Sequence, residues 1–400
     1  MKSLLQELQQ HKSLAWIGVL LSLEHIFTFV FWLTERPVHL ILSNSHPSVC
    51  WPALPFCEAL KPSAEILSGL LGLYLILAVG SLACWGLQRF KCAILLLWTL
   101  LFFKVGVILL DYRLTGNYHY IPTILTLVFL LVPGRIRALP VAFFVVYFTA
   151  GILKLNHQWL SGAAINDRLV PEVLTRVGVW YVLILELILV FLLFARKDRW
   201  FYFLFVQLVL FHLYSWHLTR FFYPSVMLLL LGILLITRPL QKEEGFSRSW
   251  MRCLKQRSAQ ALLLAFILLQ LPQYYIPGEA ALTGEGRMYA LIMYDGRTQC
   301  QPHLTIWKKS QNKEEVPLVP PWLLTRTSCD PLIFMRLTEK VCTWSEADPA
   351  VLQIDLNIPI RYQNQETWQP LVSLTNVCKQ PLTYSSFFSN YWINKLKLEP

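Results

Sequence analysis

Apolar and polar positions divide this chain into two parts that meet near residue 276. Before that point the apolar residues come in long runs, most of them able to cross about 30 Å of hydrocarbon as a helix. Nine such runs centre on residues 14–34, 63–85, 92–110, 119–133, 136–154, 177–195, 200–217, 221–237 and 259–276. The pattern predicts a polytopic α-helical membrane protein with about nine spans in residues 1–276.

Two details refine this prediction. The fourth and eighth runs are short for a straight span, so these helices can be broken or thinned beside a polar cavity, where irregular backbone is tolerated. The first run follows MKSLLQELQQHK, lacks a small-residue cleavage site and is interrupted by Glu24 and His25. We therefore expect a retained first span with a cytoplasmic N-terminus rather than a signal peptide.

From residue 277 the periodicity of the apolar positions changes to two. VLQIDLNIPIRYQ, at residues 351–363, alternates apolar and polar residues almost throughout. Further short strands are predicted between turn residues for RMYALIMYD, HLTIWKK, PLIFMRLT and PLVSLTNVC. Residues 277–400 should form a small, mainly-β extracytoplasmic domain, such as a β-sandwich packed on the outer membrane face.

The positions of Lys and Arg orient the predicted spans. Alternate connections are basic, and by the positive-inside rule they belong in the cytoplasm. They contain Arg89 and Lys91; Arg135 and Arg137; Arg196, Lys197 and Arg199; then Arg238, Lys242, Arg248, Arg252, Lys255 and Arg257. The opposite loops are less basic and contain Asp111, Asp167 and Glu172. The predicted localisation is a bacterial inner membrane, with residues 277–400 periplasmic or extracellular.

Composition supports the bilayer as the solvent. Apolar residues make up 55% of the chain and charged residues 15%, whereas soluble domains have about a quarter charged residues. The net charge of +11 comes mostly from the basic connections, because residues 277–400 carry twelve basic and twelve acidic residues. This distribution of charge indicates the lipid bilayer, and not nucleic acid, as the partner of the basic residues.

Cysteine placement agrees with this topology. Three of the nine cysteines, Cys84, Cys92 and Cys253, fall in spans or on the cytoplasmic side. The other six fall outside, as structural disulfides require, and are Cys50, Cys57, Cys300, Cys329, Cys342 and Cys378. Cys50 and Cys57 can close a local loop, while the last four can pair in three ways. Metal binding is the weaker alternative, because no cysteine or histidine cluster has ligand spacing.

Ionisable residues within the apolar runs are candidate functional groups, because each is unfavourable in lipid unless paired or hydrated. They are Glu24, His25, Lys104, Glu186 and His212, with Lys154 at the end of the fifth run. A structural alternative is a salt bridge of Lys104 with Glu186 or Glu24. Burial at an apolar edge would lower the pKa of Lys154 and make it a base; a snorkelling interfacial lysine is the competing interpretation.

Four stretches over residues 45–300, together with the start of the tail, resemble the HTTM (horizontally transferred transmembrane) or vitamin K-dependent gamma-carboxylase superfamily, as a short bacterial member. They are the cysteine loop running into ALKPSAE, LDYRLTGNYHY, YFTAGILKLNHQW with Gly162, and FHLYSWHLTRFFYPSVML, and the tail contributes LTGEGRMYALIMYDGRTQC. In that family the lysine matching Lys154 deprotonates reduced vitamin K and starts its oxygenation. The strong base so formed removes a proton from a glutamate side chain, and carbon dioxide adds to the carbanion.

The resemblance implies roles for seven residues of an outward-facing cavity. Lys154 would be the catalytic general base, and the cofactor would be reduced vitamin K or another quinol, with no metal. The residues implied to bind substrate are Asp111, Asn117, Tyr120, Trp159, His212 and Glu186.

Departures from the family pattern argue against glutamate carboxylation itself. Leu153 stands where family carboxylases have a second lysine, and Tyr118 replaces a histidine, although His119 follows it. VPGRIRALP lacks an acidic, histidine-bearing segment, and the external region is short. The alternative function is a non-carboxylating maturation or export factor that binds a secreted peptide or protein through the C-terminal domain. A transporter ranks below both, since no inverted repeat is detected.

Overall fold

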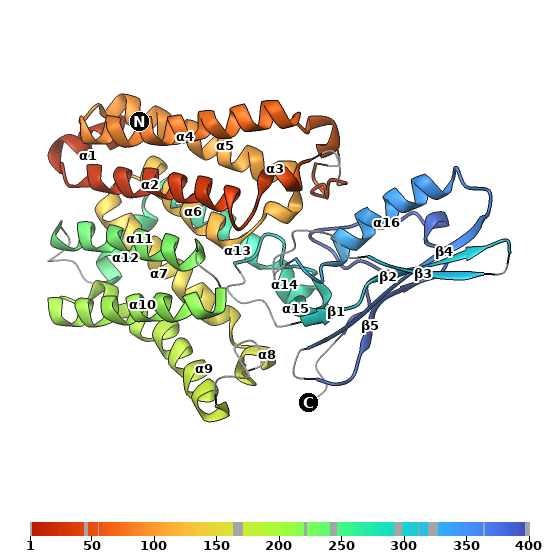
Figure 1. Ribbon diagram of the computed structural model, residues 1–400. Coiled ribbons are helices and arrows are strands. Elements are labelled where there is room, and N and C mark those ends of the chain that lie inside the picture. Colours follow the sequence, from red (N-terminus) through yellow and green to blue (C-terminus); the bar gives the residue numbers. More distant parts are fainter. Residues whose placement is uncertain are drawn as a thin grey trace.

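The computed structural model describes residues 2–43, 47–54, 56–162, 171–219, 222–240, 246–291, 298–310, 312–318, 327–362 and 365–396. A helical bundle occupies one side of the molecule and a curled sheet the other (Figure 1). The long bundle helices are α2 (Leu14–Leu33), α4 (Ala64–Gly86), α5 (Phe90–Leu110), α6 (Asn117–Leu131), α7 (Arg135–Leu153), α9 (Glu172–Leu187), α10 (Asp198–Thr219), α11 (Phe222–Thr237) and α13 (Arg257–Gln270).

Shorter elements connect the long helices. They are α1 (Lys2–Gln10), α3 (Val38–Ile41), α8 (His157–Leu160), α12 (Phe246–Leu254), α14 (Pro272–Tyr275) and α15 (Ala280–Thr283), with 3-10 turns η1 (Cys57–Leu60), η2 (Tyr112–Leu114), η3 (Leu189–Phe194) and η4 (Arg238–Leu240). Each of the nine predicted apolar runs contains one long helix, so the helical part of the prediction is confirmed.

Six helices in the described part of the chain are long and apolar enough to cross a membrane. They are α2, α4, α5, α7, α9 with η3, and α11 with η4. Their outer faces carry large apolar side chains: Ile76 and Phe102 are each 68% exposed. Apolar surface on this scale is unusual for a soluble monomer, so the helices suggest a multi-pass membrane protein. Helix α6 has 15 residues and α13 has 14, shorter than a straight span needs.

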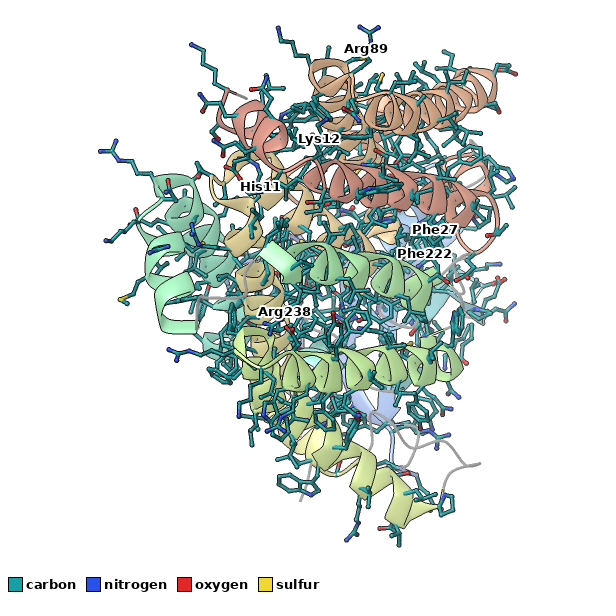
Figure 2. The ribbon with its side chains drawn as sticks, turned by 90° about the vertical axis from the view of Figure 1, so that its left-hand side faces the viewer. His11, Lys12, Phe27, Arg89, Phe222 and Arg238 are labelled. Atoms are coloured by element: carbon teal, nitrogen blue, oxygen red, sulfur yellow. A yellow bond between two sulfur atoms is a disulfide. The ribbon has the colours of Figure 1, made fainter. Side chains whose placement is uncertain are left out.

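Basic connections meet at the end of the bundle opposite to the sheet. Arg135, at the start of α7, bonds Glu7 of α1 at 2.7 Å, and Arg238 bonds Asp198 at the start of α10 at 2.9 Å. Figure 2 views the molecule from this side and labels Lys12, Arg89 and Arg238. The alternation of basic and non-basic connections is therefore reproduced as two ends of one bundle.

The C-terminal region contains one antiparallel sheet of five strands. These are β1 (Thr298–Cys300), β2 (His303–Lys308), β3 (Lys313–Pro317), β4 (Val351–Tyr362) and β5 (Gln369–Leu374). The long strand β4 pairs with β1, β2 and β5, and β2 pairs with β3. Helix α16 (Pro331–Ser345) packs against β4 and buries Leu332, Ile333 and Phe334. The region is a single sheet with a helix, so the predicted sandwich is wrong in the part that the structure describes.

The strand prediction for PLIFMRLT is wrong, because this segment begins α16. Asp330 caps the helix by accepting a hydrogen bond from the Leu332 N–H at 3.1 Å, and Pro331 occupies the first turn. An N-cap aspartate followed by proline is a helix-start signal that outweighs a short apolar run. Of RMYALIMYD, residues 287–291 form no strand and residues 292–295 lie outside the described chain.

Three disulfides confirm the predicted bonding of all six cysteines. Cys50 pairs with Cys57 across the loop that precedes α4. The tail cysteines pair as Cys300–Cys329 and Cys342–Cys378, one of the three combinations left open by the sequence. Cys300–Cys329 joins β1 to the segment before α16, and Cys342–Cys378 joins α16 to the turn after β5.

The tail and the bundle share a core at their junction. Tyr112, after α5, donates a hydrogen bond to Asp330 at 2.8 Å, and Lys340 of α16 bonds Glu58 at 2.5 Å. Val49, in the loop before α4, belongs to the same buried apolar cluster as residues of β2 and β4. The sheet is therefore packed on the bundle by buried contacts as well as by surface ion pairs.

Candidate functional site

Lys154 lies directly after the last residue of α7 and pairs with Glu186 of α9. Its Nζ is 2.8 Å from Oε1 and 2.6 Å from Oε2, so both carboxylate oxygens accept from one ammonium group. Lys154 is 2% exposed and Glu186 is fully buried. Because α7 starts at the basic end of the bundle, this pair lies toward the end that carries the sheet.

Gly151 explains how α9 comes close enough for this pairing. A Cβ at this position would lie 2.7 Å from Leu187 Cδ2 and 3.0 Å from Glu186 Cβ, both too close for ordinary packing. The absent side chain therefore lets α9 pack on α7 with Glu186 facing Lys154. Helix α9 then changes to the 3-10 turn η3 after Leu187, a distortion often found at functional positions.

A histidine and two tyrosines adjoin the ion pair. His212 Nε2 on α10 is 2.7 Å from the Tyr147 hydroxyl on α7. Tyr223 of α11 lies with its ring 5.9 Å from the His212 ring and interacts electrostatically with Glu186. Within the described residues His212 Nδ1 has no hydrogen-bond partner, so a buried imidazole nitrogen is left available beside the pair.

Trp159 lies over this group. Its ring centroid is 5.2 Å from Lys154 Nζ, within cation–π range, and its indole N–H donates to the Val179 carbonyl at 3.3 Å. The side chain is 5% exposed. Trp159 therefore packs on the lysine as a buried aromatic side chain.

The arrangement can move protons and exclude water. The bidentate pair allows the proton to reside on Lys154 or on Glu186, and burial disfavours the two separated charges. The His212–Tyr147 contact can relay a proton, since imidazole accepts and donates at different nitrogens. Buried groups that can exchange a proton in this way are what general acid–base catalysis requires. In the described chain no group of three His, Cys, Asp or Glu residues is placed to hold a metal ion.

The structure brings Lys154, Glu186, Trp159 and His212 together but places the other predicted binding residues elsewhere. Asp111 is fully buried in a structural role: its carboxylate pairs with Arg113 at 2.8 Å and accepts the Val49 N–H at 3.1 Å.

Asn117 and Tyr120 belong to the first turns of α6. Asn117 is the first residue of that helix and is half-buried. Tyr120 is also half-buried, and its hydroxyl accepts a hydrogen bond from the Gln270 side-chain amide at 3.4 Å. No hydrogen bond or ion pair between described residues joins these two side chains directly to Lys154 or Glu186.

A second polar cluster is buried between α2, α4, α5 and α6. Lys104 pairs with Glu24 at 2.6 Å, which selects one of the two partners considered for this lysine. Glu24 also accepts a hydrogen bond from Thr28 at 2.8 Å, and His25 Nδ1 is 2.6 Å from the Tyr74 hydroxyl. Each acidic and basic group of this cluster thus has a local partner within the spans.

Tyr147 is the functional candidate that the sequence reasoning missed. It precedes Lys154 by seven residues, which is two helical turns and therefore the same face of α7. A tyrosine in an apolar run needs a partner for its hydroxyl when buried. That spacing was a usable signal, whereas the contact with His212 joins residues 65 positions apart and could not be read from the chain.

No family model, curated protein or solved structure matches this chain.

Proposed function

We propose that this chain is a multi-pass membrane enzyme of the HTTM or vitamin K-dependent gamma-carboxylase superfamily, in which Lys154 is the general base. The substrate would be a quinol, such as reduced vitamin K, or another lipophilic molecule with an acidic O–H group. The observation that supports this best is the buried Lys154–Glu186 pair with His212 and Trp159 against it.

The proposed step is a proton transfer at a named atom. With its extra proton held by Glu186, the neutral Lys154 amine takes the O–H proton of the substrate and leaves an oxyanion. The ammonium so formed is balanced by the substrate oxyanion and stays hydrogen-bonded to Glu186, which keeps its own proton, at 2.6 Å. The substrate ring would stack on Trp159, and the proton gained by Lys154 would leave through the His212–Tyr147 contact to water before the next turnover.

The membrane orientation is part of the proposal. The basic end of the bundle would face the cytoplasm, and the sheet would lie in the periplasm or outside the cell. Three disulfides in the junction and the tail support an oxidising compartment on that side. Cys253, half-buried in α12, should then react with a membrane-impermeant maleimide only from the cytoplasmic side. Labelling from the opposite side would show that the proposed orientation is inverted.

A matched pair of lysine variants tests the reaction. Lys154→Met should abolish quinol oxidation by the purified protein, measured by the change in ultraviolet absorbance under oxygen. Lys104→Met is the control, because it breaks an equally buried lysine–glutamate pair away from the proposed site. Carbon dioxide fixation into a glutamate-containing peptide is measured in parallel. Equal turnover by wild type and Lys154→Met, per folded protein, removes Lys154 from the mechanism.

A second candidate function is a maturation or export factor for a secreted peptide or protein. Exposed aromatic side chains on the tail favour it: Phe388 is 71% exposed, Tyr391 70% and Trp344 67%. Such residues commonly anchor partner proteins. Phe388→Ser together with Tyr391→Ser should abolish co-purification of a secreted client while leaving quinol oxidation unchanged. A variant that keeps its client excludes this surface.

A further inference from the structure

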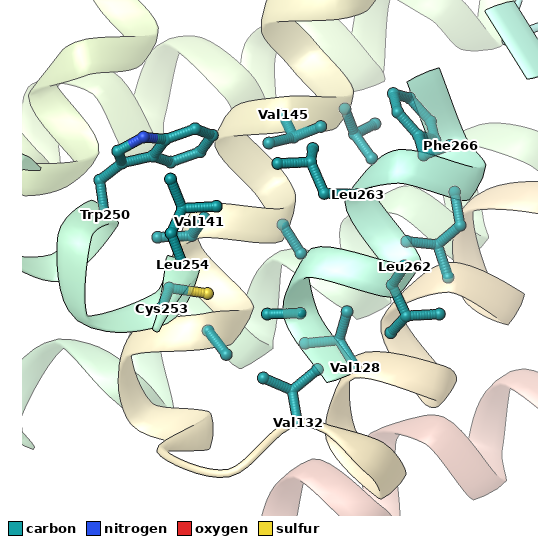
Figure 3. Close-up of a pocket in the computed structure, with 15 residues that line it drawn as sticks. Val128, Val132, Val141, Val145, Trp250, Cys253, Leu254, Leu262, Leu263 and Phe266 are labelled. Carbon is teal, nitrogen blue, oxygen red and sulfur yellow. The ribbon is translucent and has the colours of Figure 1, made fainter. Parts of the chain in front are cut away.

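An apolar cavity lies between α6, α7, α12 and α13, away from the Lys154 site. It is a half-open hollow of about 60 Å³, several times the space that one water molecule needs. Figure 3 shows its wall: Val128 from α6, Val141 and Val145 from α7, and Trp250, Cys253, Leu262 and Phe266 from α12 and α13. Apart from the Cys253 thiol and the Trp250 indole, the side chains that line the cavity are hydrocarbon.

Such a cavity does not suit water. A buried water molecule needs two to four polar partners, and cavities lined by aliphatic side chains stay dry and take apolar ligands. Leaving the space empty would also forfeit dispersion contacts along its whole wall. The matching occupant is a flexible hydrocarbon chain, which a lipid bilayer supplies at high concentration.

Basic residues adjoin the cavity at the connection from α12 to α13. Lys255 and Arg257 are exposed there, next along the chain to the lining residues Leu254 and Ala259. Helix α12 lies at the end of the bundle opposite to the sheet (Figure 1). At this end a lipid headgroup would meet cations, and an anionic headgroup attracts each nearby Lys or Arg.

We propose that this half-open cavity holds a segment of one acyl chain of an anionic phospholipid, whose phosphate binds Lys255 and Arg257. The hydrocarbon wall selects the tail and the two cations select the headgroup charge. The site rests on the chain lying in a bilayer, and it is independent of the chemistry at Lys154.

Native mass spectrometry of the full-length protein tests the site. Protein in mild detergent is titrated with phosphatidylglycerol or phosphatidylcholine of identical acyl chains. Phosphatidylglycerol should bind about tenfold more tightly than phosphatidylcholine. Lys255→Gln with Arg257→Gln should remove that preference, whereas the control Lys197→Gln with Arg199→Gln, at exposed cations before and in α10, should keep it. Equal binding of both lipids to wild type overturns the headgroup assignment.

Filling the cavity tests the acyl-chain part. Ala142→Phe and the milder Ala259→Leu, both at lining positions, should reduce binding of either lipid at least about tenfold. Ala83→Phe is the control, because Ala83 is exposed on α4. Thermal unfolding reports whether each variant is folded, and Ala259→Leu keeps the test valid if Ala142→Phe does not fold. Folded cavity variants that bind lipid as wild type does contradict the proposal.

Cys253 gives an independent readout, because its thiol faces the cavity (Figure 3). In a Cys84→Ser and Cys92→Ser background, Cys253 is the one cysteine outside the three disulfides. Its reaction with a small maleimide should slow about tenfold when phosphatidylglycerol is added to the detergent solution, and Ala142→Phe should remove this protection. Labelling rates that do not depend on lipid overturn the site.

Discussion

Two regions of the bundle contain the same set of interactions in different places. Each buries a lysine–glutamate ion pair and a histidine–tyrosine contact. One consists of Lys154, Glu186, His212 and Tyr147, and the other of Lys104, Glu24, His25 and Tyr74. The shared chemistry shows that a buried charge pair alone does not identify a functional site.

The surroundings distinguish the two regions. Lys104 lies inside α5 with six residues of that helix after it, whereas Lys154 lies where α7 ends and the chain turns. The carboxylate of Glu24 is shared between Lys104 and Thr28, while the described hydrogen bonds of the Glu186 carboxylate go to Lys154 alone. Lys154 therefore combines a buried ion pair with a position at the end of a helix, where the chain turns.

Removing one charge from either pair should give the largest effect. Lys154→Met and Lys104→Met should each lower the free energy of unfolding by about 3–5 kcal/mol, because an uncompensated buried carboxylate remains. Replacing both partners, as in Lys104→Met with Glu24→Leu, should recover most of the loss. Denaturant-induced unfolding in detergent micelles measures this. A similar loss in single and double variants would show that neither pair is a coupled charge pair.

Glycine substitutions should separate the regions by their packing. Gly18→Ala brings a Cβ to 2.2 Å from the Trp85 ring, where α2, the helix of Glu24, packs on α4, and Gly151→Ala brings one to 2.7 Å from Leu187, next to Glu186. Each should cost about 1–3 kcal/mol of stability, but Gly151→Ala should also lower quinol turnover by displacing Glu186. Gly80→Ala, with its nearest contact at 3.8 Å, is the control. Thermal unfolding and turnover are compared for all three, and equal turnover in Gly18→Ala and Gly151→Ala contradicts the distinction.

The tyrosine hydroxyls should give a smaller and more nearly equal effect on stability. Tyr147→Phe and Tyr74→Phe each leave a buried histidine nitrogen without its partner, which costs about 1–3 kcal/mol. If the His212–Tyr147 contact returns protons, Tyr147→Phe should also shift the pH dependence of turnover. Tyr74→Phe should leave that profile unchanged. Identical pH profiles in wild type and Tyr147→Phe remove Tyr147 from proton transfer.

The smallest expected effect is on stability at acidic pH. It concerns Asp355 of β4, which lies in the tail and outside both ion-pair clusters. Burial alone would raise the pKa of Asp355, but hydrogen bonds from the Asn376 N–H, Gln353 and Trp307 outweigh it and lower the pKa below 3.8. The resulting stabilisation is present above pH 3.8 and is lost as the pH falls through the lower, folded-state pKa. Asp355→Asn should therefore flatten the dependence of the thermal midpoint on pH below about 4. A slope equal to that of wild type contradicts this assignment.

The helices and the set of disulfide-forming cysteines could be predicted because their signals are local. An apolar run specifies a helix in lipid wherever it occurs, since the backbone must satisfy its own hydrogen bonds there. The same reasoning failed for α16, where the cap formed by Asp330 and Pro331 decided the structure against a short apolar pattern. The same reasoning also predicted a β-sandwich, whereas the structure has one sheet in which β4 has partner strands on both sides. The arrangement of strands could not be predicted because it depends on contacts between residues distant in sequence.

The sequence by itself determined the two-part organisation, the apolar helices and the grouping of the basic connections, and it indicated Lys154 as a candidate because this lysine lies at an apolar edge. Only the tertiary structure decided which carboxylate each buried lysine meets. Glu24 and Glu186 are equally plausible partners in sequence, and the choice follows from which helices pack together: α2 against α5 for Lys104, and α9 against α7, at Gly151, for Lys154. Partner choice is a property of packing between distant segments, and local periodicity carries no information about it.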